Sequence, residues 1–207
     1  MKFEWKKQEK EIYGVSTKPC ILDVPVQKYI VISGSGNPNG EIFSDQVAVL
    51  FSVAYKIKTA YRSLAEKSRE ITDYTVYPLE GVWSKASDKD DLVKEELQYR
   101  IMIRQPAFIT GEIFDQALKT VQKKKDHPLL AKVSLETICD GTCVQILHQG
   151  SYDAEPASFA VMDQYCMEHG YKRMDQKHRE IYLNHAKRTK EANLKTILRY
   201  KVTDAGK

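Results

Sequence analysis

Long apolar runs are missing from this 207-residue sequence, and so is a hydrophobic start. No segment approaches the roughly 18–20 apolar residues that a helix needs to cross a bilayer. The first residues, MKFEWKKQEKEIYG, are charged and contain no apolar stretch of the kind that a secretion signal carries. We therefore expect no signal peptide, no membrane partner and a cytoplasmic location.

Cysteine is also scarce, with four residues in the chain. So few thiols in a chain of this length do not predict a disulfide framework, and they are typical of a reducing compartment. Cys139 and Cys143 form one C-x₃-C pair, with His148 and Cys166 further along the chain. A structural zinc site usually has two close pairs, and Cys166 fits a buried position on a helix, so we predict no metal.

A strong charge imbalance is absent, and so are the usual motifs of nucleotide binding and nucleophilic catalysis. The net charge of +4 is too weak to predict a nucleic-acid partner without a basic element of defined shape. The loop GSGNPNG has glycines spaced G-x-G-x-x-x-G with a proline between them, which favours a turn into a helix over a dinucleotide site. No G-x-S-x-G elbow occurs. We predict that the protein uses no cofactor.

What the sequence does contain is an ordered series of strand and helix patterns. With 42% hydrophobic residues, the chain is long enough to bury a sizeable core. Apolar residues at three- and four-residue steps predict the helices, and β-branched or alternating runs predict the strands. The expected elements are strand 26–33, helix 41–66, strands 74–84 and 97–106, helix 110–124, strand 143–152, a helix between 153 and 170, and strands 171–183 and 194–202.

The order strand–helix–strand–strand occurs twice, which predicts an internal duplication of structure. The predicted fold class is α+β, an antiparallel sheet with helices on one face, whose other face is covered or concave. We expect an N-terminal arm at 1–25 and a single domain at 26–207. The domain would consist of a first module at about 26–106, a linking helix at about 110–125 and a second module at about 131–203.

Tyrosine is the frequent aromatic residue, with twelve tyrosines against six phenylalanines and two tryptophans. Aromatic rings with polar edges suit the wall of a pocket that stays partly wet. Such residues also simply stabilise strands, and composition alone favours that interpretation. The tyrosines and tryptophan in or beside predicted strands are Tyr74, Tyr77, Trp83, Tyr99, Tyr152, Tyr171 and Tyr182.

The stretch HREIYLNH contains the most specific candidate, because its residues separate by strand parity. Ile181 and Leu183 fall on one face, and Glu180 and Tyr182 fall on the other. A carboxylate among aromatic faces attracts cations, or, when partly buried, has a raised pKa and acts as a general acid. The alternative is an exposed strand residue or a weak salt bridge.

Glu80, in PLEGVW, holds a comparable place in the first module, so these two strands are expected to face each other in the middle of the molecule. On a regular strand, Glu80 and Trp83 point to opposite faces. Only a bulge at Gly81 would bring both side chains into one cleft. Of the two, Trp83 is the preferred cleft residue.

Five segments in this order, PLEGVW, YRIMIRQPAFIT, CVQILHQGSYDAE, EIYL and LKTILRYKV, resemble the GyrI-like family of small-molecule binders. The resemblance covers almost the whole chain. It implies the fold of the effector-binding domains of multidrug-responsive regulators, with a ligand cleft between two modules. It also implies that Glu180 matches a regulator glutamate that meets cationic drugs, that Tyr182 shares its face, and that Trp83 forms an aromatic wall.

The chain is also similar to stand-alone members known as cyclopropanoid cyclopropyl hydrolases, since no DNA-reading helix-turn-helix precedes the domain. This similarity implies opening of the strained ring of DNA-alkylating natural products, with Glu180 and Tyr182 as catalytic residues. The alternative is a non-catalytic domain that sequesters or senses flat, amphipathic or cationic molecules. We expect a small-molecule partner and a monomer or weak homodimer. The ligand-binding candidates are Trp83, Tyr77, Tyr152, Glu80, Tyr171 and His148.

Overall fold

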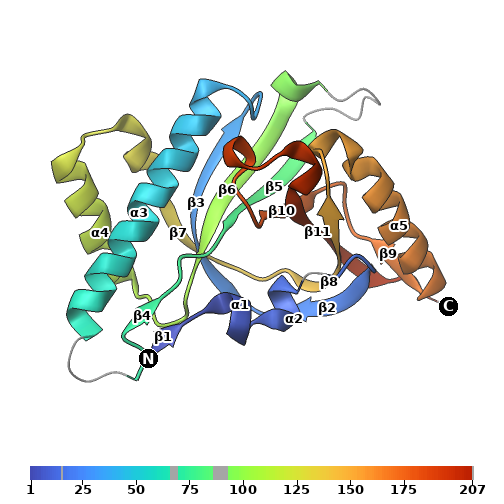
Figure 1. The fold of residues 1–207 in the computed structure, drawn as a ribbon, viewed down its shortest axis with the longest axis horizontal. Helices are drawn as coiled ribbons and strands as arrows, with labels where there is room; N and C mark the ends of the chain where they lie inside the picture. Colours follow the sequence, from blue (N-terminus) through green and yellow to red (C-terminus); the bar gives the residue numbers. More distant parts are fainter. Residues whose placement is uncertain (15, 66–69, 86–92, 207) are drawn as a thin grey trace.

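The computed structural model describes residues 1–14, 16–65, 70–85 and 93–206. Its described strands form one nine-stranded sheet and a separate two-stranded pair (Figure 1). The sheet consists of β2 (Cys20–Val24), β3 (Gln27–Ser35), β5 (Leu79–Lys85), β6 (Leu97–Gln105), β7 (Ser134–Ile138), β8 (Gly141–Gln149), β9 (Tyr171–Arg173), β10 (His178–Tyr182) and β11 (Lys195–Asp204).

All neighbouring strands in this sheet run antiparallel, in the order β2–β8–β11–β10–β5–β6–β3–β7. β9 pairs with the end of β11, beyond the segment that pairs with β10. The two-stranded pair joins β1 (Lys2–Phe3) to β4 (Asp73–Tyr74) in parallel. The predicted α+β class with an antiparallel sheet is confirmed.

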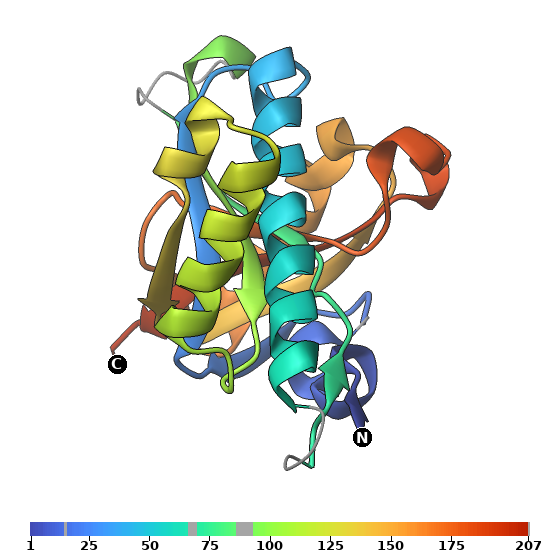
Figure 2. The same cartoon turned by 90° about the vertical axis from the view of Figure 1, so that its left-hand side faces the viewer.

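The expected duplication is present in the connectivity. β3, α3 (Glu41–Ala65), β5 and β6 make the first strand–helix–strand–strand unit, and β8, α5 (Glu155–Glu168), β10 and β11 make the second. α4 (Gly111–Lys124) lies between the units in sequence, and Figure 2 shows it alongside α3. Thr110 caps α4, since its hydroxyl accepts a hydrogen bond from the backbone N–H of Ile113. Glu66, the expected end of the first helix, lies outside the described residues.

Strand register explains why α3 and α5 lie on the same face of the sheet. Residues directly opposite each other on paired strands point to the same face. One such row crosses six strands, and its outer members are apolar while its centre is a glycine and a glutamate. In order from β3 to β8, the row is Ile32, Ile101, Gly81, Glu180, Leu198 and Ile146.

Each helix covers one side of this row. Leu50, Val53 and Ile57 of α3 are fully buried with the apolar residues of β3 and β6, while Met162 and Cys166 of α5 pack with those of β8 and β11. Full burial of a large apolar side chain contributes about 1.5–3 kcal/mol, so these two clusters fix both helices. None of the described helices is both long and apolar enough to cross a membrane.

The N-terminal residues cover part of the opposite face of the sheet. They form α1 (Trp5–Gln8) and α2 (Lys10–Tyr13) before β2 joins the sheet edge beside β8. Trp5 and Tyr13 are only 4% and 5% exposed, and the ring of Trp5 stacks on that of Tyr77 at 5.9 Å between centroids. This segment therefore contributes to the core as well as to the surface.

Two expected strands are divided, and one strand was not expected. The run 74–84 is divided because Pro78, just before β5, has no N–H to donate to a ladder. The run 171–183 is divided by a turn in which the Arg173 guanidinium donates to the carbonyl oxygens of Asp175, Gln176 and Lys177. β7 was not expected, because a five-residue edge strand carries little periodic signal.

Candidate functional site

The two units meet where β5 pairs with β10, and Gly81 lies opposite Glu180 at this junction. A Cβ atom on Gly81 would lie 2.6 Å from Nε1 of Trp83 and 3.3 Å from Oη of Tyr182. Real Cβ atoms do not approach an indole ring so closely. The glycine thus leaves room for Trp83 and Tyr182 to lie over the strand, next to Glu180.

Glu180 is held by hydrogen bonds to both of its carboxylate oxygens. The Tyr182 hydroxyl donates to Oε2 at 2.8 Å, and His178 Nε2 lies 3.0 Å from Oε1. Trp83 Nε1 in turn donates to the Tyr182 hydroxyl at 3.0 Å. Glu180 is 8% exposed, so its orientation is fixed inside the protein and not by solvent.

Glu155, the first residue of α5, completes this group. Oxygen and nitrogen atoms of Glu155, His178 and Glu180 lie within 4.8 Å of one another. Glu155 is 6% exposed, and its Oε1 has no hydrogen-bond partner among the described residues. Burial, and then the charge of Glu180, raise the pKa of Glu155 to about 9. Glu155 therefore holds its proton more tightly than an ordinary carboxyl group does.

No sequence pattern singled out Glu155, although this residue ends the segment CVQILHQGSYDAE. The alternation of side chains along a strand gives no information about Glu155, because this residue belongs to helix α5, which packs on the sheet. Its position at the start of α5, two residues after Asp153, was the available signal. An acidic residue there also has the ordinary interpretation of a favourable charge at a helix N-terminus.

Aromatic side chains from both units surround the carboxyl group pair. The Trp83 ring lies 5.8 Å from Phe43 of α3, and Phe159 of α5 lies 4.9 Å from the His178 ring. Tyr152, 39% exposed, meets Tyr182 edge-on at 6.0 Å. These contacts place rings on both sides of Glu180, which suits a flat ligand.

The two tyrosines of this cluster are hydrogen-bond donors over the whole physiological range. Burial, and then the Glu180 charge, raise the pKa of Tyr152 to about 12. The same two causes raise the pKa of Tyr182 well above its usual value. Tyr182 therefore keeps its proton, which it donates to Glu180 in a hydrogen bond.

His148 and Tyr171 lie outside the immediate surroundings of Glu180. His148 is buried, with Nε2 2.8 Å from the Ser151 carbonyl oxygen and Nδ1 2.9 Å from the Ser158 hydroxyl. It ties β8 to the beginning of α5, the segment that carries Tyr152 and Glu155. Tyr171 is half-buried on β9 and packs with the apolar cluster under α5.

Glu80 and Tyr77 require a correction, because the structure does not bring them together with Glu180. β5 is regular, without a bulge at Gly81, so Glu80 and Trp83 leave the strand on opposite faces. Glu80 is fully buried and accepts hydrogen bonds from Arg179 at 2.9 Å and Tyr13 at 3.1 Å. The Tyr77 hydroxyl donates to Glu9 of the N-terminal segment at 2.8 Å. The structure therefore separates both residues from Glu180, and a ligand-binding role for them stays a prediction.

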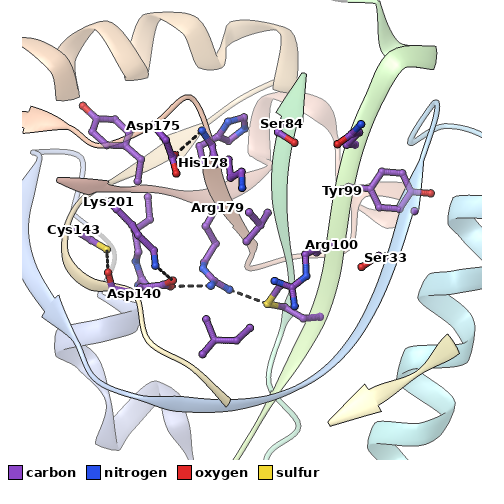
Figure 3. A pocket seen from close by; sticks show the side chains of 18 of the residues that line it. Ser33, Ser84, Tyr99, Arg100, Asp140, Cys143, Asp175, His178, Arg179 and Lys201 are labelled. Carbon is purple, nitrogen blue, oxygen red and sulfur yellow. Dashed lines mark hydrogen bonds and ion pairs between the residues drawn. The ribbon is translucent and has the colours of Figure 1, made fainter. Parts of the chain in front are cut away.

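The face that carries Glu80 contains a hollow of about 700 Å³ (Figure 3). Arg179 lies at its centre, between Asp140 and Lys201 on one side and Arg100 on the other. The strands that line it come from both units, as they do around Glu180. The sheet thus has a candidate functional site on each of its two faces, both where β5 pairs with β10.

The group of Glu155, His178 and Glu180 contains the kinds of atom that can hold a metal ion. Both oxygens of Glu180 already have hydrogen-bond partners, the Tyr182 hydroxyl and the His178 imidazole. We therefore interpret the group as an acid–base set. Cys139 and Cys143 are free thiols, exposed and buried respectively.

Fold and site together define a class: two strand–helix–strand–strand units in one sheet, with a buried carboxyl pair among rings at their junction. The model of the GyrI-like small-molecule-binding domain matches residues 17–201, so the chain belongs to the GyrI-like family. The resemblance noted from the sequence is thereby confirmed.

Solved structures agree with this assignment. A hydrolase from Listeria innocua is 32% identical, with a TM-score of 0.87, and the match covers 98% of this chain and 100% of that chain. A second structure of a hydrolase from Listeria innocua is 30% identical, with a TM-score of 0.84 and coverage of 97% and 100%. The C-terminal domain of EcmrR is similar in fold alone, at 12% identity, a TM-score of 0.54 and coverage of 90% and 98%. No curated protein matches the chain.

Proposed function

We propose that this protein binds flat, amphipathic or cationic small molecules at the Glu180 cluster, between α3 and α5, and hydrolyses the cyclopropyl ring of cyclopropanoid DNA-alkylating compounds. The observation that carries the proposal is the buried pair of Glu155, an uncharged acid, and Glu180, an oriented carboxylate. Enzymes obtain a proton donor and a proton acceptor at the same pH by giving two carboxyl groups different surroundings.

In this mechanism, aromatic rings hold the planar electrophile while the two carboxyl groups move protons. Glu155 donates its proton to the conjugated carbonyl oxygen of the substrate. A water molecule forms a C–O bond to the cyclopropane carbon, the strained C–C bond breaks, and its electron pair becomes part of the resulting phenol. Glu180 accepts the proton of the attacking water, and proton transfer back to Glu155 restores both groups. The water supplies every atom that is added.

The relatives support hydrolysis over simple binding. Two structures of Listeria innocua proteins that are hydrolases match this chain along nearly its full length at 30% and 32% identity. One chain contributes both walls of the proposed site, Phe43 from the first unit and Phe159 from the second. We therefore also propose that the monomer is sufficient for activity.

The direct test is incubation with a cyclopropapyrroloindole compound and detection of the ring-opened product, one water heavier, by mass spectrometry. Glu155→Gln removes the proton donor and should lower kcat by about 10²–10⁴-fold, the usual contribution of general acid catalysis. Glu180→Gln should have a comparable effect. Glu168→Gln, an exposed change on the same helix as Glu155, is the matched control and should leave kcat unchanged.

A second function, sequestration or sensing without chemistry, is favoured by the attraction that Glu180 and its neighbouring rings exert on cations. Tight binding of the compound with no ring-opened product, at enzyme concentrations equal to substrate, would overturn the hydrolase proposal and leave this one. Unchanged turnover in Glu155→Gln would remove Glu155 from the mechanism.

A further inference from the structure

The hollow on the opposite face of the sheet is lined by more basic than acidic side chains. The basic ones are Arg100, Lys177, Arg179, Arg199 and Lys201, and the acidic ones are Asp140 and Asp175. Apolar side chains of Val82, Met102 and Ile138 also line it. A hollow of about 700 Å³ with this lining has the size and mixed chemistry of a small-molecule site.

Three of the arginines stand in one row across the sheet. Arg100 lies opposite Val82, Val82 opposite Arg179, and Arg179 opposite Arg199. Like charges directly opposite each other on neighbouring strands are destabilising. The fold therefore tolerates an unfavourable arrangement at the centre of the hollow.

Only part of this positive charge is compensated within the described residues. Arg179 is held between Glu80 at 2.9 Å and Asp140 at 2.8 Å, and Lys201 lies 3.4 Å from Asp140. Arg100 pairs with Glu136 at the rim, where its side chain remains 43% exposed. Asp140 thus serves two cations, and Lys201, 39% exposed, still faces solvent.

Arg199 differs from its neighbours because its contacts are neutral. It is 1% exposed and donates to Oε1 of Gln145, at 3.0 and 2.7 Å, and to the Ile12 carbonyl oxygen at 2.6 Å. No carboxylate of the described residues forms an ion pair with it. A buried charge normally has an opposite charge as partner, since its desolvation is costly. An uncharged amide could make similar contacts with Gln145 and Ile12, so these contacts do not require a cation.

We propose that this hollow is a second ligand site, which binds a small organic anion with a flat or aliphatic body. Its carboxylate, sulfonate or phosphate group would accept hydrogen bonds from the accessible Arg100 and Lys201, near the positive charges of the buried Arg179 and Arg199. The ligand's apolar body would contact Val82 and Ile138, which are both partly exposed. The site lies on the sheet face opposite the Glu180 side chain, although His178, which contacts Glu180, also borders the hollow. The proposal does not depend on the hydrolase proposal.

The probe for this site is naphthalene-1,5-disulfonate, measured by isothermal titration calorimetry with the complete protein at low and at high salt. Naphthalene-1,5-diol has the same ring system without the charge and serves as the ligand control. Binding of the disulfonate should be saturable and should weaken as salt is added. The diol should bind at least tenfold more weakly.

Two variants test the residues. Arg100→Gln and Lys201→Gln are changes at partly exposed positions that should leave the fold intact, and each should weaken disulfonate binding about tenfold. Lys119→Gln removes the same charge from an exposed position on α4 and should have no effect. Glu155→Gln, at a residue of the proposed catalytic pair that does not line the hollow, should leave disulfonate binding unchanged, which separates this site from the proposed catalytic one.

Absence of saturable disulfonate binding at millimolar concentrations would overturn the proposal, as would equal binding of the diol. The same conclusion would follow if Arg100→Gln and Lys201→Gln bound the probe as tightly as Lys119→Gln does.

Discussion

Glu80 on β5 and Glu180 on β10 lie within one residue of each other in strand register, yet their side chains leave the sheet on opposite faces. Glu80 is fully buried and joined to the Arg179 guanidinium, in a network that also includes Tyr13 and Asp140. Glu180 is also buried, but its neighbours are a hydroxyl, an imidazole and another carboxyl group.

The comparison shows how surroundings divide one residue type between two tasks. A buried carboxylate with a cationic partner stabilises the fold, and removal of either member leaves an uncompensated charge. A buried carboxylate beside a second carboxyl group raises the pKa of that neighbour and makes a proton available at neutral pH. The first arrangement is structural, and the second is suited to chemistry.

The largest expected effect belongs to the structural glutamate. Glu80→Gln removes one of the two carboxylates paired with Arg179, and the free energy of unfolding should fall by up to about 3–5 kcal/mol, the cost when a buried charge loses its partner. Chemical denaturation measures it. Glu168→Gln at an exposed position should change the same quantity by less than about 0.5 kcal/mol. A Glu80→Gln protein as stable as this control would show that the ion pair is not structural.

The second-largest loss of stability is expected at Gly81, which follows Glu80 in the sequence and lies opposite Glu180 on the neighbouring strand. Gly81→Ala places a methyl group where the Trp83 indole lies, and the resulting displacement should cost about 1–3 kcal/mol of stability. It should also reduce substrate binding, because Trp83 and Tyr182 move together. Gly111→Ala on α4 is the control, since its Cβ would meet no atom within 4 Å. Equal stability and equal substrate KM in both variants would contradict the close packing described here.

The pH dependence of stability should separate the two faces. In the unfolded chain Glu155 titrates near its ordinary value of 4.5, whereas in the folded protein its pKa is about 9. Between these values the unfolded chain loses its proton first, so this group makes the folded state less stable as pH rises. The stability of the native protein relative to Glu155→Gln should therefore decline from pH 5 to pH 9.

Urea denaturation at pH 5, 7 and 9 measures this difference. If Glu155 is the proton donor, kcat for ring opening should also fall above about pH 9, where Glu155 loses its proton in the folded enzyme. A stability difference that is constant with pH would show that Glu155 is ionised at neutral pH, and would remove it as proton donor.

The smallest effect is expected for Tyr171→Phe. Tyr171 packs with the apolar cluster beneath α5 and is not one of the residues around Glu180. The loss of its hydroxyl should therefore change the free energy of unfolding by less than about 0.5 kcal/mol. Ring opening of the cyclopropanoid substrate should be unaffected. A clear increase in substrate KM would return Tyr171 to the ligand-binding residues that the sequence suggested.

Local patterns were sufficient to predict the elements around the site. The three- and four-residue apolar steps of α3 and α4, and the alternation in HREIYL, each record which residues face a core. The same parity placed Glu180 with Tyr182 and separated Glu80 from Trp83, and the structure has both arrangements. The prediction of one continuous strand at 171–183 was wrong. The run is divided by a turn that the Arg173 side chain stabilises through hydrogen bonds, and hydrophobic periodicity does not reveal such a turn.

Partners distant in sequence could not be derived in this way. Glu155 belongs to helix α5 and lies close to Glu180 on β10. Trp5 and Tyr13, from the start of the chain, pack together, and Tyr13 bonds to Glu80 of β5. The role of His148, which holds the beginning of α5, depends on Ser151 and Ser158 being close in space. No spacing rule within a single strand contains this information.

The sequence by itself determined the α+β class, the duplicated order of strands and helices, and the face of β10 on which Glu180 lies, because these follow from periodicities of two and 3.6 residues along a local segment. Only the tertiary structure decided which carboxyl group meets Glu180, which meets Arg179, and where the arginine row gathers. Those outcomes depend on strand register and on the burial of charges, and both are set when distant segments pack together.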